Sequence, residues 1–195
     1  RAYPETEIKD LPEVVEFDWA GPTAKHIGTV SHRILQDLSG RDIESFEPEA
    51  IWLSVYSDFA YGMFRSLGLA RFDLSGSLEA VRKIVLAVLG SERGKWLFSS
   101  THSNACSELV LSSLEGSDSG RVIIDRTFVD RDGIRWIVDF KTGEHKGGGR
   151  EQWLDSEWER YLPQLMRYAR ALAATESRKT KLALYFPVLD GWRSA

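Results

Sequence analysis

The sequence predicts an α/β fold: a mixed β-sheet with the element order αβββαβ, flanked by helices and preceded by an N-terminal helical elaboration. Two short apolar runs, at residues 122–125 and 136–141, are joined by a tight turn, which predicts a pair of central strands. Apolar residues recur at helical spacing through much of residues 22–100. A long helical pattern and a last apolar run at 182–188 follow the strand pair and complete this order.

The N-terminal part is predicted to be mostly helical after an extended lead-in. Residues 1–21 contain spaced prolines, which are typical of a segment between regular elements. Helices are predicted over residues 23–38 and, from an aromatic-rich helical pattern, over residues 48–67. A third helix is predicted from Ser77, taken as its N-cap, through Leu89.

The C-terminal part is predicted to form the sheet. A strand is expected at residues 105–114, before the central pair, and a helix from about 153 to 174 follows the pair. The final apolar run then supplies the last strand. We therefore expect one domain over the whole chain, with residues 22–100 mostly helical and residues 101–195 forming the sheet core.

The composition fits a globular protein with one core and no membrane segment. Hydrophobic residues make up 43% of the 195 residues and charged residues 28%, and no stretch reads as a membrane span or signal peptide. The single cysteine, Cys106, excludes an internal disulfide and suits a reducing cytoplasm. Because the chain begins with Arg1 instead of Met, we expect it to be part of a longer protein.

The turn between the central strands sets their register. Gly133 supplies the positive φ of a three-residue turn, so that Asp130 faces Ile134 across the hairpin. This register places Asp125 directly opposite Asp139, with their Cβ atoms within about 5.5 Å, whereas a one-residue slip would separate them. Two carboxylates this close repel each other, and a divalent cation between them would relieve the repulsion. Hard oxygen ligands of this kind suit Mg²⁺ or Mn²⁺.

A lysine follows on the same face of the second strand. Because strand side chains alternate with a period of two, Lys141 points to the same side as Asp139. Its ammonium group could stabilise negative charge on a phosphorus centre under attack, or orient a metal-bound water. A solvated, salt-bridged hairpin is the alternative, but the apolar residues around these charges favour a central strand pair.

These residues resemble a known nuclease signature. Asp125, followed by the Asp-Phe-Lys-Thr-Gly run at 139–143, resembles the PD-(D/E)xK motif in the form found in the nuclease domain that ends the RecB and AddA chains of bacterial helicase–nucleases. The resemblance implies a restriction-endonuclease-like core and a metal-dependent deoxyribonuclease. Asp125, Asp139 and Lys141 are then the predicted catalytic residues.

Three further motifs occur in the order that this family shows. Residues 28–35 resemble its N-terminal GTxxH helix, which implies that His32 is a metal ligand. Glu108 stands where a strand glutamate commonly precedes the first aspartate. Gln164 and Tyr168 lie in a stretch that resembles the QLxxYA helix, which implies contact with DNA or positioning of the lysine and the scissile phosphate. The motifs together cover about residues 22–187.

The predicted centre holds one Mg²⁺, with Mn²⁺ as the other candidate, and the sequence leaves open a second metal near Glu108. Its ligands are His32, Asp125, Asp139 and the backbone carbonyl of Phe140, and Glu108 is a candidate for a further ligand, directly or through water. Each motif also has a plain structural reading. The histidine could be a satisfied core residue, and the glutamine–tyrosine pair of the late helix could lie on an ordinary helix surface.

The resemblance implies a setting as well as a chemistry. It predicts a bacterial, cytoplasmic and nucleoid-associated helicase–nuclease that processes double-strand breaks for recombinational repair, with a helicase domain in the same full-length chain and a partner subunit. A net charge of −4 argues against tight DNA binding by this domain alone, so we expect a single strand to be delivered to it. One cysteine cannot supply the iron–sulfur cluster of some relatives. A catalytically silent docking module and a free-standing endonuclease are the alternatives. The sequence does not distinguish the RecB-like branch from the AddA-like branch.

Overall fold

The computed structural model describes residues 21–115, 118–143, 145 and 147–195. The predicted lead-in therefore lies outside the described residues, except for its last residue. The N-terminal part is helical: α1 Pro22–Leu38, a 3₁₀ turn Ile43–Ser45, α2 Pro48–Ile51, a π-helical turn Trp52–Tyr56, α3 Ser57–Ser66, α4 Arg71–Gly90 and α5 Glu92–Leu97. The C-terminal part contains β1 Ser103–Glu115, β2 Asp118–Val129, β3 Arg135–Phe140, α6 Arg150–Ala173, β4 Thr180–Phe186, a 3₁₀ turn Pro187–Leu189 and β5 Gly191–Ser194.

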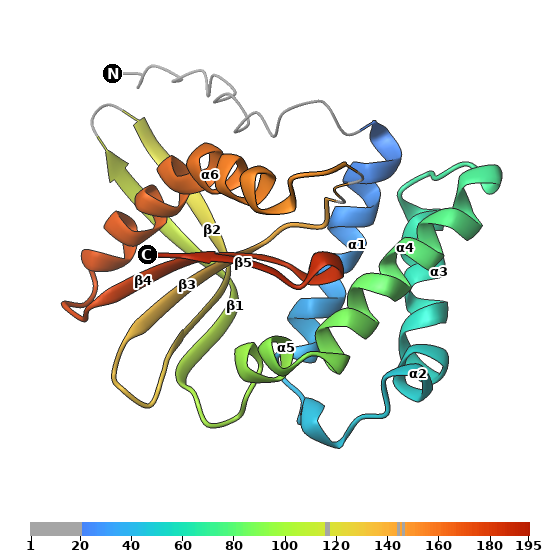
Figure 1. Cartoon of the computed structure of the whole chain (residues 1–195), viewed down its shortest axis with the longest axis horizontal. Coiled ribbons are helices and arrows are strands. Elements are labelled where there is room, and N and C mark those ends of the chain that lie inside the picture. The colour runs from blue at the N-terminus through green and yellow to red at the C-terminus, as the bar shows by residue number, and fades with distance from the viewer. Residues whose placement is uncertain (1–20, 116–117, 144, 146) are drawn as a thin grey trace, which may run out of the picture.

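The five strands form one mixed sheet in the order β1-β2-β3-β4-β5. Neighbouring strands are antiparallel except β3 and β4, which are parallel and connected through α6. Figure 1 shows α6 across one side of the sheet, with α1 to α5 gathered at the other. The predicted α/β fold with flanking helices and a helical N-terminal part is confirmed. No helix among the described residues is long and apolar enough to span a membrane.

Each face of the sheet buries its own apolar layer. From β3, Trp136, Val138 and Phe140 pack against the N-terminal helices, whereas Ile137 packs against α6. This alternation follows from the period of two along a strand. It also directs the side chain of Asp139 toward α6, because this residue shares the parity of Ile137.

The predicted hairpin is present with its predicted register. Gly133 has a φ of 75°, and the Asp130 N–H donates to the Ile134 carbonyl over 3.0 Å. The strands then pair Thr127 with Ile137 and Arg126 with Val138. Asp125 and Asp139 are the next residues of the two strands after this last pair. The strands therefore have the register from which the proximity of Asp125 and Asp139 was predicted.

Three predicted boundaries were wrong. Ser77 is buried inside α4, which begins at Arg71, so it is not an N-cap. Packing of the apolar side of α4 carries this helix through Gly76 and Ser77, although both are weak helix formers. The predicted 48–67 helix is interrupted by the π-helical turn. The last predicted strand ends at Phe186, since Pro187 cannot donate to a strand ladder, and β5 follows it.

A buried ion pair links the start of β3 to the segment after α6. Arg135 is 5% exposed, and its guanidinium donates to both carboxylate oxygens of Glu176, over 2.6 and 2.9 Å. It also donates to the Asn104 carbonyl over 3.0 Å, which ties in the start of β1. The hydrogen bonds from Arg135, with its charge, hold the pKa of Glu176 below its usual range.

Replacing Glu176 by glutamine is expected to lower the free energy of unfolding by about 1–2 kcal/mol near neutral pH, because charge-assisted hydrogen bonds to a buried guanidinium are weakened. A lowered carboxylate pKa stabilises the fold above the ordinary glutamate pKa, and this contribution is lost as the pH falls through the folded-state pKa. Urea denaturation of both proteins should therefore show a difference near neutral pH that closes below about pH 3. A difference that is the same at both pH values would contradict this origin.

Candidate active site

All the residues predicted for the site line one cleft of about 990 Å³ between α1, the sheet and α6. They come from five elements and from the segment directly after β3. The predicted residues in the lining are His32, Glu108, Asp125, Asp139, Phe140, Lys141, Gln164 and Tyr168. The fold therefore brings together side chains of α1 and α6 that are more than a hundred positions apart in the sequence.

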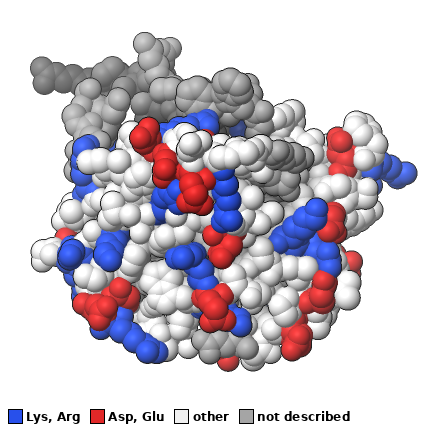
Figure 2. Space-filling view, viewed as in Figure 1, with Lys and Arg blue, Asp and Glu red and all other residues white. Residues whose placement is uncertain are grey.

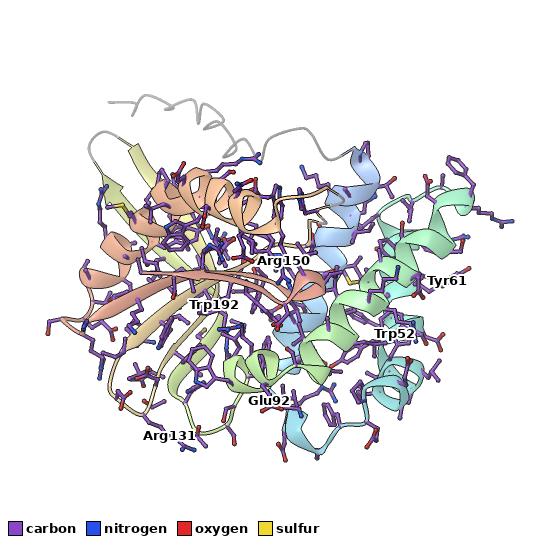
Figure 3. The ribbon with its side chains drawn as sticks, viewed as in Figure 1. Trp52, Tyr61, Glu92, Arg131, Arg150 and Trp192 are labelled. Atoms are coloured by element: carbon purple, nitrogen blue, oxygen red, sulfur yellow. The ribbon has the colours of Figure 1, made fainter. Side chains whose placement is uncertain are left out.

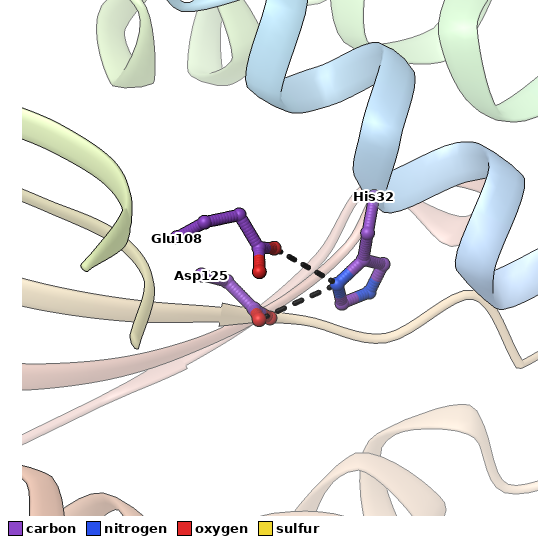
Figure 4. Close-up of side chains that lie close together, drawn as sticks. All are labelled: His32, Glu108 and Asp125. Atoms are coloured by element: carbon purple, nitrogen blue, oxygen red, sulfur yellow. Dashed lines mark ion pairs between the residues drawn. The ribbon is translucent and has the colours of Figure 1, made fainter. Parts of the chain in front are cut away.

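His32, Glu108 and Asp125 form a group with the composition of a metal site. One ligand atom from each lies within 4.8 Å of the other two. Nδ1 of His32 is 3.3 Å from Oδ1 of Asp125 and 3.9 Å from Oε1 of Glu108 (Figure 4). An imidazole nitrogen and two carboxylates are donors that bind divalent cations.

Asp139 and Lys141 form a second group beside the first. Nζ of Lys141 lies 2.8 Å from Oδ2 of Asp139, and the Gln164 amide donates to Oδ1 of the same carboxylate over 3.4 Å. Gln164 also donates to the Tyr168 hydroxyl. Both residues of the predicted glutamine–tyrosine pair line the cleft, and Gln164 contacts the aspartate, so the pair does not lie on an open helix surface.

The two groups are joined next to the last residue pair of β2 and β3, Arg126 with Val138. The Phe140 N–H donates to Oδ2 of Asp125 over 2.8 Å, so Asp125 is held by β3 on one side and by His32 on the other. Asp139 was predicted as a metal ligand with Asp125, but its carboxylate is paired with Lys141 in this structure. Its ligation, and that of the Phe140 carbonyl, stay predictions.

Tyr161 is a site residue that the sequence reading missed. Its ring lies under the Lys141 ammonium, with 3.7 Å from Nζ to the ring centroid, and it lines the same cleft. It precedes Gln164 by three positions and Tyr168 by seven, so all three share one face of α6. That spacing was the available signal.

The family model of the PD-(D/E)XK nuclease superfamily matches residues 7–191. The chain belongs to this superfamily. A search of curated proteins found no match. Membership implies nuclease activity, and PD-(D/E)XK nucleases typically use a divalent metal ion, in agreement with the donor set of the His32 group.

The charges of this PD-(D/E)XK site are strongly coupled. Burial disfavours the imidazolium of His32, but the Asp125 carboxylate and the other acidic groups outweigh it and raise the pKa of His32 to about 9. Burial likewise opposes ionisation of Asp125, yet His32 and the Phe140 N–H hold the pKa of Asp125 below its usual range. The imidazolium of His32 thus partly neutralises the carboxylates of Asp125 and Glu108, as a bound metal ion would.

The second carboxylate and the lysine respond to the same field. Burial and the charge of Asp125 raise the pKa of Asp139 to about 6, although the Lys141 ammonium opposes this. Burial disfavours the charged form of Lys141, but Asp139 outweighs it and raises the lysine pKa. Lys141 therefore presents a firmly charged ammonium group in the cleft of the nuclease fold.

Glu108 has a strained backbone. Its φ is 54°, in the left-handed region, which costs a non-glycine residue about 1–2 kcal/mol. It lies between the pairs Ser107–Arg126 and Leu109–Ile124 of the β1–β2 ladder. Burial and the charge of Asp125 raise the pKa of its carboxyl group. Strain of this kind in a residue that meets the His32 group is typical of a functional position.

A second cavity, of about 730 Å³, lies away from this site. It is lined by residues of α5 and of the hairpin turn, with Glu92 and Arg131 among them. Figure 3 shows both at the hairpin end of the molecule. Asp132 lines this second cavity as well, and it offers an acidic control position outside the predicted site.

Proposed function

We propose that the chain is a Mg²⁺-dependent DNA nuclease that hydrolyses phosphodiester bonds as the nuclease part of a RecB/AddA-type helicase–nuclease. The observation that carries this proposal is the convergence of the acidic His32 group and the Asp139–Lys141 pair in one cleft. The ordered motifs of the sequence support the helicase-linked branch, and with it a role in processing double-strand breaks for recombinational repair.

Each residue has a role in this proposal. His32, Asp125 and Asp139, with the Phe140 carbonyl and Glu108, would hold the ion. When bound, a divalent cation polarises a phosphate oxygen and lowers the pKa of a coordinated water. Lys141 donates hydrogen bonds to the phosphate oxygens as charge develops on them.

Gln164 and Tyr168 position the Asp139 carboxylate from the α6 side of the cleft. Gln164 fixes Oδ1 of Asp139, so that Oδ2 is left for the ammonium group of Lys141. Tyr168 accepts from Gln164 and is buried, and burial with the nearby Asp139 charge raises the pKa of its hydroxyl to about 12. It therefore acts as a neutral hydrogen-bonding group beside the substrate.

The surface charge supports delivery of the strand by another domain. Figure 2 shows acidic and basic side chains interspersed over the face that it draws, without a broad basic area there. Phosphate binding depends on clustered positive charge, and the chain carries a net charge of −4. We infer that a helicase domain in the same full-length chain, with a partner subunit in the bacterial cytoplasm, feeds a single strand into the cleft.

The test is degradation of end-labelled single-stranded DNA with Mg²⁺ or Mn²⁺, and with the metal removed by a chelator. Wild type should cut the strand only with metal, and Lys141→Ala and Asp139→Ala should both fall to background. Far-ultraviolet circular dichroism checks that the variants are folded. The same comparison in the full-length protein, with its helicase partner and ATP, tests the wider proposal. Equal behaviour of wild type and both variants there would overturn the site assignment in favour of a silent docking module.

A further inference from the structure

The Lys141 ammonium is held between a carboxylate and an aromatic ring. Nζ lies 2.8 Å from Oδ2 of Asp139 and 3.7 Å from the centroid of the Tyr161 ring. The Lys141 side chain is only 16% exposed. A cation at this distance from a ring face is attracted to it, and the attraction is stronger where water is excluded.

The ring restrains the ammonium group without consuming its hydrogen-bonding capacity. A lysine has a flexible four-carbon stem and three N–H donors. An added carboxylate would fix the stem but would also compete with a phosphate for the donors and the charge. The π face of Tyr161 contributes neither a full negative charge nor a strong acceptor. One contact to Asp139 and one to the ring therefore orient the group and leave it available to a phosphate.

A second cation near the ring is less well placed. The Arg160 guanidinium lies 5.2 Å from the Tyr161 ring centroid, and this arginine is ion-paired with Glu157 over 3.3 Å. Lys141 is the closer of the two cations. The ring is supplied by α6, the helix that also supplies Gln164. One face of this helix therefore contacts both members of the Asp139–Lys141 pair: Gln164 contacts the aspartate and Tyr161 the lysine.

We propose that Tyr161 is a positioning residue that holds the Lys141 ammonium through a cation–π contact, so that it meets the scissile phosphate. This inference rests on the proposed role of Lys141 in cleavage. It makes the negative face of the ring, and not the tyrosine hydroxyl, the feature that matters.

Four substitutions at position 161 distinguish the effect of the negative ring face from the effects of side-chain shape and of the hydroxyl group. Tyr161→Phe and Tyr161→Trp keep a negative face, and Tyr161→Leu removes it with little loss of apolar volume. Trifluorophenylalanine at this position keeps the shape but weakens the face, which makes it the matched control if the leucine variant packs poorly. Thermal unfolding of each variant checks that the fold is retained.

The first measurement is independent of activity. The Lys141 ε-methylene protons should be shifted upfield in NMR spectra of wild type by the ring current of Tyr161, with assignment by comparison with Lys141→Arg. The shift should persist in Tyr161→Phe and disappear in Tyr161→Leu. Wild-type and leucine spectra with the same ε-methylene shift would overturn the contact.

The second measurement is single-turnover cleavage of labelled single-stranded DNA. Tyr161→Leu should lower the cleavage rate constant about tenfold at saturating enzyme, with the half-saturating enzyme concentration little changed, and the phenylalanine variant should stay within about twofold of wild type. The fluorinated variant should fall between them. A phenylalanine variant as slow as the leucine variant, or a leucine variant as fast as wild type, would overturn the proposal.

Failure of the inference can be told apart from failure of the proposed function. If Lys141→Ala cleaves DNA as wild type does, including the case in which neither cleaves, the proposed function of this site fails first. If Lys141→Ala is inactive while Tyr161→Leu is fully active, the proposed function stands and the role of the ring is wrong.

Discussion

Replacing Asp125 by asparagine is expected to abolish metal-dependent cleavage, with a loss of about a thousandfold or more in rate, since a metal ion contributes several kcal/mol of charge stabilisation. Asp125 contacts both His32 and the Phe140 N–H, at the point where the two parts of the site meet. A neutral amide supplies a weaker ligand for a hard cation. Because the amide oxygen can still accept from the Phe140 N–H, the fold should survive.

Metal binding can be measured for this variant without any cleavage. An ion that binds only the folded chain stabilises it by about 2.7 kcal/mol at a concentration of a hundred times Kd. Thermal unfolding with and without Mg²⁺, and Mn²⁺ titration followed by electron paramagnetic resonance, should show binding in wild type and its loss in Asp125→Asn. Asp132→Asn, in the second cavity, should behave as wild type. Equal stabilisation of wild type and Asp125→Asn by Mg²⁺ would remove Asp125 from the ligand set.

The parts of the fold that the sequence predicts well are those governed by local rules. Gly133 and the length of its turn determine the hairpin register, and the register brings Asp125 to Asp139. The start of α4 was wrong because Ser77 resembles an N-cap locally, whereas buried packing extends the helix beyond it. β5 was missed because a four-residue strand carries little periodicity of its own and forms by pairing with β4.

Some residues of the site could likewise be predicted from local patterns in the sequence, and others could not. His32 was predicted from a motif, and the structure brings it to Asp125. The sequence could not show that Glu108, instead of Asp139, completes the closest group with them, because strand alternation does not reveal a left-handed residue. Tyr161 was missed because aromatic residues on a helix are more often core residues than partners of a charged group.

Glu108 allows strain and function to be measured separately. Glu108→Ala removes the carboxylate but keeps a side chain at a φ of 54°, and Glu108→Gly removes both the carboxylate and the strain. The glycine variant is expected to be more stable to urea than the alanine variant by about 1 kcal/mol, since glycine adopts the left-handed region without a steric cost. Both variants should bind Mn²⁺ about 10- to 100-fold more weakly than wild type, with a matching loss of cleavage, whether the carboxylate binds the ion directly or through water.

Glu108→Gln is the matched control for charge. It keeps the length of the side chain and the backbone strain, and it removes one of the negative charges that face Asp125. Its stability should equal or exceed that of wild type in the absence of metal, because the repulsion between the carboxylates of Glu108 and Asp125 is removed, while its metal affinity falls as in the other two variants. Equal stability of the alanine and glycine variants would show that the strain is relieved elsewhere, and unchanged metal affinity in all three would place Glu108 outside the metal site. A glycine variant that is more stable than the alanine variant and equally inactive would mean that the strained backbone has a cost in stability, at a position where the site requires the carboxylate.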